Sequence, residues 1–148
     1  MICLAGDLAA QGFAGGAGVQ YLAVFASDDD GVPQIWIPGV RATWLRKHFV
    51  LPDVSLGVAI NGSDVQYASS DVGGGYRFGS RNVVGFIEAG PTFLVGAGGG
   101  GVGAFLGVGA YLRLTDRLAL RLDASPRVYS DGFTALGLGV AISSFPRP

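Results

Sequence analysis

The chain has 148 residues, of which 49% are hydrophobic and only 14% are charged, and its formal net charge is −1. This length suits one domain, and the few scattered basic residues exclude the basic surface that nucleic-acid binding requires. A single cysteine, Cys3, excludes an internal disulfide and a cysteine metal cluster.

The N-terminal segment, residues 1–11, is expected to lie outside the folded domain. It lacks the basic start and the long apolar run of a complete signal peptide. Residues 8–10 followed by Gln11 do resemble the end of one, so two interpretations remain: a signal-peptide remnant at a truncated or misassigned start, or a disordered N-terminus. The folded domain is expected over residues 12–145, with a short C-terminal tail at 146–148.

From there the chain divides into eight runs that are each expected to form a β-strand. The runs lie near residues 17–27, 34–45, 49–60, 71–79, 83–95, 101–114, 118–129 and 133–145. Residues typical of tight turns separate them, among them Asp30-Gly31, Asn61-Gly62 and Asp131-Gly132. Asn-Gly and Asp-Gly pairs supply the positive φ that tight hairpins need. The order of runs and turns predicts an all-β, antiparallel, up-and-down arrangement.

Within the runs the hydrophobic pattern has a period of two. One face of the seventh run is apolar and consists of Leu118, Leu120, Leu122, Ala124 and Val128. The other face is mostly polar and consists of Ala119, Arg121, Asp123, Ser125, Arg127 and Tyr129. Because successive side chains on a strand point to opposite faces, the run has one uniformly apolar side, and the other runs follow the same rule.

A transmembrane helix is the alternative interpretation for one part of the chain. Residues 94–112 carry no charge and are long enough to span a bilayer as a helix. They are also rich in glycine, and each glycine in a helix interior costs about 1 kcal/mol relative to alanine. The alternation continues without a break into Arg113, Arg121 and Asp123, which a helix does not explain. Strands are therefore expected here.

The charged residues indicate which face of the sheet lies inside a barrel. One face, followed through all the strands, carries the charges Arg41, Asp53, Arg77, Glu88, Arg113, Arg121, Asp123 and Arg127. The same face holds most of the strand glycines, which a water-facing strand would not favour. The opposite face is apolar throughout and far exceeds the apolar patch that water tolerates. The pattern predicts a transmembrane barrel with lipid outside and a lumen charge network inside.

Two tryptophans on the apolar face indicate the depth of the membrane. Trp36 and Trp44 are eight residues apart, which corresponds to ~27 Å along a strand at ~3.4 Å per residue. With a strand tilt of ~40° they would be separated by ~20 Å of depth, close to the spacing of the two aromatic girdles around a ~25 Å apolar band. The alternative is that both are ordinary core aromatics.

These features resemble the eight-stranded outer-membrane barrel family, the group of small OmpA-like barrel domains. The most similar stretch, residues 107–123, reads as a strand, a short Thr115-Asp116-Arg117 turn and a second strand, and residues 137–145 are similar to the family's C-terminal strand. The similarity covers residues 12–145 as a pattern of residue types. One departure is that the family usually ends on an aromatic residue, whereas residues 146–148 follow Phe145, which is also out of phase with the apolar face.

The resemblance implies a porin-family barrel of the Gram-negative cell envelope, located in the bacterial outer membrane. It implies the lipid bilayer and lipopolysaccharide as surroundings, the barrel-assembly machinery as a partner during biogenesis, and a monomer. The expected role is structural, in adhesion or in envelope integrity, with a lumen filled by side chains. The alternative is a small-molecule binder or narrow channel of the same fold, although eight strands leave an interior only wide enough for side chains.

Catalytic residues are not expected in this chain. His48 is the only histidine, has no serine near it at the spacing used by the lipid A deacylases of this barrel size, and is interpreted as a solvated turn residue. Asp28, Asp29 and Asp30 could suggest Ca²⁺, but three adjacent acids in a Gly-Pro loop are typical of a solvated hairpin. We expect no enzyme activity, no cofactor and no metal, and we interpret the lumen charges as a salt-bridge network.

Overall fold

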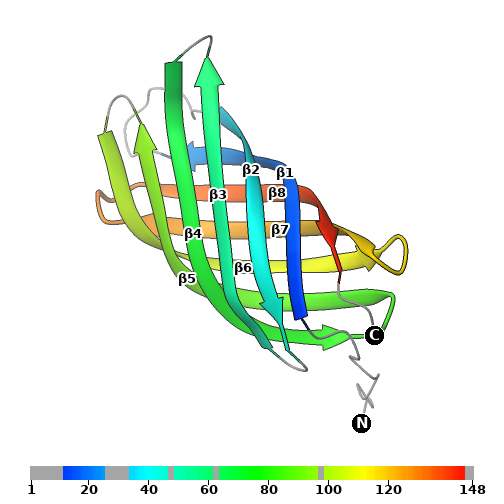
Figure 1. The fold of residues 1–148 in the computed structure, drawn as a ribbon. Helices are drawn as coiled ribbons and strands as arrows, with labels where there is room; N and C mark the ends of the chain where they lie inside the picture. The colour runs from blue at the N-terminus through cyan, green and yellow to red at the C-terminus, as the bar shows by residue number, and fades with distance from the viewer. Residues whose placement is uncertain (1–11, 26–33, 47–48, 62–63, 97–98, 146–148) are drawn as a thin grey trace.

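The computed structural model is a closed barrel of eight antiparallel strands (Figure 1). It describes residues 12–25, 34–46, 49–61, 64–96 and 99–145. The strands are β1 (Gly12–Phe25), β2 (Gln34–Leu45), β3 (Phe49–Asn61), β4 (Asp64–Gly79), β5 (Val83–Gly96), β6 (Gly99–Arg113), β7 (Leu118–Tyr129) and β8 (Thr134–Ser144). Each strand pairs with its neighbours in sequence, and β1 also pairs with β8, which closes the ring. The predicted eight-stranded up-and-down barrel is confirmed.

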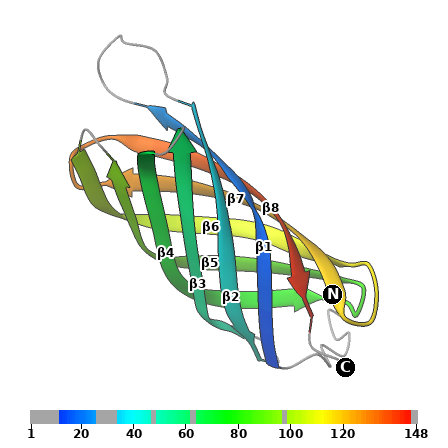
Figure 2. The same cartoon turned by 45° about the horizontal axis from the view of Figure 1, so that its top comes forward.

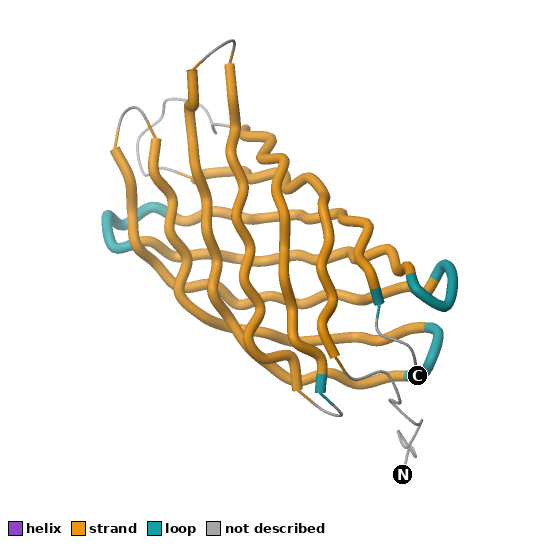
Figure 3. Tube along the Cα trace, in the orientation of Figure 1, coloured by secondary structure: helices purple, strands orange, loops and turns teal. Residues whose placement is uncertain are grey.

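The connections between the strands lie at the two ends of the barrel (Figures 2 and 3). One end carries the start of β1, the end of β8 and the turns at 80–82 and 114–117, and we call it the turn end. In its β6–β7 turn, the Thr115 hydroxyl accepts hydrogen bonds from the backbone N–H groups of Arg117 (3.2 Å) and Leu118 (3.1 Å). This is a typical turn role of threonine. The opposite end, which carries the β7–β8 connection at 130–133, is called the loop end.

Two strands are longer than the sequence pattern predicts. β1 begins at Gly12 and not near residue 17, and β4 begins at Asp64 and not near residue 71. The extension of β1 is mostly glycine and alanine, and that of β4 mixes small and polar residues with Val65 and Tyr67, so the alternation of polarity is weak in both. Pairing with neighbouring strands extends them, through Gly12 opposite Leu45 and Tyr67 opposite Gly96. The predicted turn residues at 28–31 and at 62 lie outside the described residues.

The segment for which a helix was the alternative is a strand pair. The described residues of this segment, 94–96 and 99–112, belong to the end of β5 and to most of β6. The two strands pair from Val83–Leu112 to Gly96–Gly99. In the part of the chain that the structure describes, there is no helix with the length and apolar character needed to cross a membrane.

Alternation along each strand separates an outer surface from a lumen, as β2 illustrates. Its outward side chains Trp36, Val40 and Trp44 are 62%, 59% and 45% exposed. Its inward side chains Ile37, Thr43 and Leu45 are 2%, 1% and 0% exposed. The apolar face is therefore outside, which is the arrangement of a membrane barrel and the reverse of a soluble one.

A row of glycines crosses the inner face of three neighbouring strands. Gly18 pairs with Gly39, and Gly39 pairs with Gly57. A Cβ atom at Gly39 would lie 2.5 Å from the backbone oxygen of Leu56 and 2.8 Å from the Cα of Gly57. The backbones approach this closely because glycine allows the wall of a narrow barrel to curve sharply.

Substitution of Gly39 by alanine is expected to lower the free energy of unfolding by about 1–3 kcal/mol, because the added methyl group collides with backbone that cannot rotate away. Gly15→Ala is the matched control. Its Cβ would lie 3.1 Å from the ring of Phe13, which can move, and the backbone oxygen of Arg41 is at an ordinary contact distance of 3.9 Å. Urea unfolding in detergent micelles measures both. Equal losses in the two variants would contradict the role assigned to the glycine row.

Candidate functional site in the barrel lumen

The lumen is filled by three layers of side chains. An apolar cluster at the turn end consists of Ala14, Leu45, Val50, Val84, Phe86, Tyr111, Ala119 and Phe145. A second apolar cluster at the loop end consists of Leu22, Ile35, Ile37, Ala59, Leu94, Tyr129 and Ala135. Between the two, inward positions are polar; along β7, for example, Arg121 to Arg127 lie between Ala119 and Tyr129. A charged layer thus lies between two mainly apolar layers, of which the one at the turn end also holds Arg77 and Arg113.

Arg121 lies at the centre of the charged layer and is 1% exposed. Its guanidinium contacts three carboxylates: Asp53 at 2.9 Å (Nη1 to Oδ2), Glu88 at 2.7 Å (Nη2 to Oε1) and Asp123 at 2.9 Å (Nε to Oδ1). Nη1 also donates a hydrogen bond to the hydroxyl of Tyr111 at 2.6 Å. A buried charge is tolerated when it is both paired and hydrogen-bonded, and Arg121 meets both conditions.

Arg41 on β2 binds the same three carboxylates at longer distances. It lies 3.2 Å from Asp53 (Nε to Oδ1), 3.2 Å from Asp123 (Nη1 to Oδ1) and 3.8 Å from Glu88 (Nη2 to Oε1). Its side chain is 14% exposed, compared with 1% for Arg121. Two arginines and three acids therefore form one cluster, in which Arg41 is the more weakly held cation.

A second cluster lies around Arg127, whose Nη2 is 2.8 Å from Oδ2 of Asp71. The Asp71 carboxylate also accepts hydrogen bonds from the hydroxyl groups of Thr92 (2.6 Å) and Ser55 (3.0 Å). Arg127 Nη1 donates to the Thr92 hydroxyl at 3.2 Å. Arg41 Nη2 lies 4.0 Å from Asp71 Oδ2, so the two clusters are in contact.

All eight charged residues predicted for the lumen lie on the inward phase of their strands. The two clusters contain six of them: Arg41, Asp53, Glu88, Arg121, Asp123 and Arg127. Arg77 and Arg113 lie closer to the turn end, where Arg77 is fully buried and the guanidinium of Arg113 is 5.0 Å from the ring centroid of Phe145. Phe145, out of phase in the sequence, points into the lumen and belongs to the turn-end apolar cluster.

Asp71 is a member of the charged layer that was not among the predicted lumen residues. The signal was present in the sequence, because Arg77 is inward and steps of two toward the N-terminus reach Asp71 and then Ser69. Both are buried, at 2% and 4% exposure. The prediction missed them because it began this strand only at residue 71, where a phase is hard to assign.

The two predicted girdle tryptophans both face outward, one toward each end of β2. Trp36, near the loop end, packs against Tyr21 with ring centroids 4.9 Å apart. Trp44, near the turn end, lies opposite Phe13 on β1. Their exposure excludes the alternative that they are core aromatics. Aromatic rings on the outer surface at both ends are the expected positions of interfacial belts.

The charged layer is built to neutralise and hold charge. Each of the four described lumen carboxylates, Asp53, Asp71, Glu88 and Asp123, lies within 4.0 Å of an arginine. Within the described ranges, no group of three or more His, Cys, Asp or Glu side chains is placed to hold a metal ion. Cys3, His48 and the acids at 28–30 lie outside the described residues.

Comparison with known proteins gives structural neighbours only. No protein-family model matches the chain, and no curated protein matches it. Neisserial surface protein A superimposes with a TM-score of 0.64 at 14% identity, over 91% of this chain and 97% of that one. Ail, the attachment invasion locus protein of Yersinia pestis, gives 0.62 at 10% identity, over 91% and 98%. The N-terminal β-barrel domain of Pseudomonas aeruginosa OprF gives 0.58 at 13% identity, over 90% and 98%.

These neighbours are small β-barrels of bacterial outer membranes, and each is matched over nearly its full length. At such identities the similarity concerns the fold. The superpositions cover 90–91% of this chain, and its apolar outer face and polar lumen agree with the fold of a membrane barrel. The chain therefore has the fold of the small eight-stranded outer-membrane β-barrels, as the resemblance in its sequence implies.

Proposed function

We propose that this protein is a monomeric outer-membrane barrel with a structural, adhesion or envelope-integrity role, and that it does not conduct. The filled lumen carries this proposal. Arg121, Arg127 and Tyr111 are 1%, 1% and 2% exposed in the middle of the barrel and at its turn end. An interior of eight strands is only wide enough for side chains, so a lumen occupied by buried side chains supports a wall element rather than a pore.

The outer surface supports residence in a bilayer. Large apolar side chains are exposed all around the barrel, among them Val40, Leu56, Ile87, Leu106, Leu122 and Leu138. Such a surface exceeds the few hundred Å² that soluble monomers expose, and lipid would cover it. The start of β1 and the end of β8 both lie at the turn end, and we take that end as periplasmic, with the loop end toward lipopolysaccharide. The barrel-assembly machinery would then insert residues 12–145 as one domain.

Cell fractionation and gel migration test the location. The protein, expressed behind an outer-membrane signal sequence in a Gram-negative host, is expected in the outer-membrane fraction. It should migrate faster in sodium dodecyl sulfate before boiling than after boiling, because a closed barrel resists the detergent. Circular dichroism in micelles should show β-structure. Recovery as a soluble monomer without detergent, or a helical spectrum, would overturn the proposal.

Conductance in planar bilayers separates this role from the alternative of a narrow channel. We expect no sustained conductance steps from the wild-type barrel, because apolar layers enclose the charged layer on both sides. A stable open level at neutral pH would support the channel instead. The heat-modifiable fraction of the same preparation is the control, since it shows that the inserted protein is folded.

A further inference from the structure

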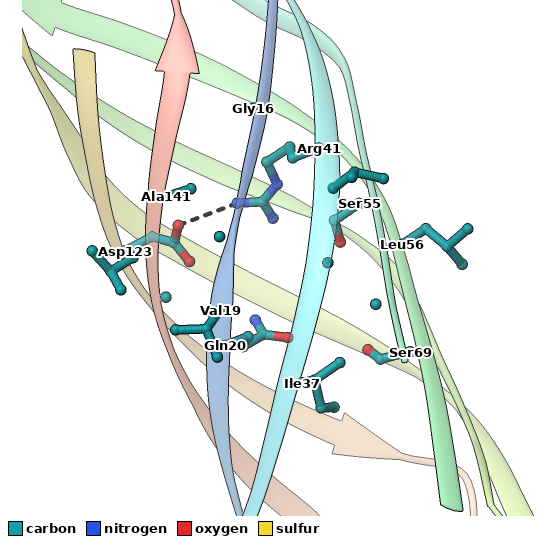
Figure 4. Close-up of a pocket in the computed structure, with 16 residues that line it drawn as sticks. Gly16, Val19, Gln20, Ile37, Arg41, Ser55, Leu56, Ser69, Asp123 and Ala141 are labelled. Carbon is teal, nitrogen blue, oxygen red and sulfur yellow. Dashed lines mark hydrogen bonds and ion pairs between the residues drawn. The ribbon is translucent and has the colours of Figure 1, made fainter. Parts of the chain in front are cut away.

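A cavity of about 60 Å³ lies at the barrel wall beside the charged layer (Figure 4). Its lining combines inward residues with the outward Val40, Leu56 and Val140. On one side it is bounded by the wall of β8, β1, β2 and β3, where the facing residues have little or no side chain: Gly16, Gly18, Gly39, Gly57, Gly139 and Ala141. The close backbone contacts at Gly39 exclude a larger residue there. The curvature of the wall therefore keeps this space open.

Polar side chains face the same space: Gln20, Arg41, Ser55, Ser69 and Asp123. Figure 4 shows them arranged around it, with the ion pair between Arg41 and Asp123 at its edge, at 3.2 Å. These two are the most exposed members of the ion-pair clusters, at 14% and 6%, whereas the others are 2% exposed or less. The cavity thus meets the charged layer at this ion pair.

The side-chain amide of Gln20 has hydrogen-bonding capacity that the described part of the protein does not use. No hydrogen bond joins it to another described residue. An amide offers two donors and an acceptor oxygen with two lone pairs. Polar groups inside proteins are normally paired, with protein, with water or with a ligand. Gln20 lies among the residues that line the cavity (Figure 4).

We propose that this cavity is a binding site for a small neutral solute of the amide or urea class. One water needs about 10–15 Å³ of such volume, so the space holds about four to six non-hydrogen atoms, the size of acetamide or urea. The carbonyl oxygen of such a solute would accept from Arg41 or Gln20. Its N–H groups would donate to Asp123 or to the serine hydroxyls.

Charge selects the class of solute. Arg41 and Asp123 belong to a cluster of two arginines and three carboxylates, so an anion would meet an excess of negative charge, and a cation would have to compete for carboxylates that are already paired with Arg41 and Arg121. A purely apolar solute would leave the amide of Gln20 without a partner, whereas Ser55 and Ser69 already bond to Asp71 and Arg127. A neutral solute with both donors and acceptors satisfies the polar groups and preserves the charge balance.

Binding at this site is independent of the envelope role proposed above and does not require conduction. The apolar layers at the two ends of the lumen would slow exchange without preventing it, since closed cavities in other proteins admit molecules as large as benzene. A barrel whose lumen is filled by side chains can therefore hold a small solute and still show no conductance in a planar bilayer.

Nuclear magnetic resonance of the full-length protein in micelles tests the site. The reporters are the backbone amide signals of Gly39 and Gly57, which line the cavity. Acetamide at millimolar concentration is expected to shift them in a saturable way. Sodium acetate and guanidinium chloride, which are charged molecules of similar size and shape, are the comparison probes and are expected to give no saturable shift.

Two variants address the site directly. Gln20→Leu keeps the volume and removes the amide, and Ala141→Leu fills the space, so each is expected to weaken acetamide binding at least tenfold. Ala17→Leu on the outer face of β1 is the control and should bind as the wild type does. If Ala141→Leu does not fold, Gln20→Leu alone decides. Saturable shifts with either ion but not with acetamide would overturn the proposal. The absence of saturable shifts with every probe would also overturn it, and would mean that the cavity holds only water.

Discussion

Replacing Arg121 with methionine is expected to lower the free energy of unfolding by about 3–5 kcal/mol, the largest effect of any single lumen substitution considered. The guanidinium contacts three carboxylates at 2.7–2.9 Å and lies 4.1 Å from the ring centroid of Phe86. Its removal leaves Asp53, Glu88 and Asp123 buried around Arg41 alone. Methionine keeps much of the volume, so the loss reports the uncompensated charge rather than a cavity.

Arg117→Met is the matched control. Arg117 is exposed in the β6–β7 turn, so the same substitution is made there at a position in contact with water. It should alter stability by less than about 0.5 kcal/mol, as is usual for such surface positions. Urea unfolding from lipid vesicles measures both, with the outward Trp36 and Trp44 as fluorescent reporters that leave the lipid on unfolding. A loss for Arg121→Met no greater than that of the control would show that the network contributes little.

Glu88→Gln in the same series separates charge from shape. The amide keeps the size of the carboxylate but removes its charge beside Arg121 and Arg41, which lie 2.7 Å and 3.8 Å from it. Arg121 retains Asp53 and Asp123, so the expected loss is smaller than that of Arg121→Met. A larger loss for Glu88→Gln would mean that the stability depends on Glu88 itself and not on the balance of the cluster.

Val40→Arg is expected to lower the free energy of unfolding by about 2–4 kcal/mol in a bilayer, because it places a charge on the lipid face near the midplane. Val40 is outward and 59% exposed, four residues from Trp36 and four from Trp44 on the same strand. If the two tryptophans mark the interfaces, Val40 is at the centre of the apolar band. The cost comes from taking the guanidinium out of water without a partner.

Leu114→Arg is the control for depth. Leu114 is 56% exposed, close to the value for Val40, but it follows β6 at the turn end. The same charge there should cost about 0–1 kcal/mol, because an arginine close to the interface reaches water. If the two variants lose equal stability, or if Val40→Arg is harmless, the outer face is not surrounded by lipid at the depth that the tryptophans indicate.

Alternation was the part of the sequence that carried the most structural information. A side chain two positions from Arg121 must point the same way, so Asp123, Ser125 and Arg127 could be assigned to one face without any knowledge of the fold. Their placement in the lumen followed from the size of the apolar face, which only lipid could cover. The same argument assigned the two tryptophans to the outer surface, where they are found.

Where the alternation of polar and apolar residues is weak or interrupted, the strand boundaries and side-chain directions predicted from the sequence are incomplete. β4 begins at Asp64, among small and polar residues, so the alternation in its first residues could not be recognised. For the same reason Asp71 was not predicted as a lumen residue. On β3 the register shifts between Val50 and Asp53, and both residues are buried although they are three positions apart. A bulge of this kind changes the phase, and pairing with β4 reveals it.

The sequence by itself determined the number of strands, their antiparallel order and which charges share the inner face, because these follow from local turn chemistry and a period of two. Only the closed barrel decided which charges meet: Arg121 and Asp53 are 68 residues apart in the chain and are brought to 2.9 Å by the curvature and register of strands that are not neighbours. The glycine row and the cavity beside it likewise arise from how closely the backbones approach in a narrow ring. Such distances depend on closure and shear, which no single strand encodes.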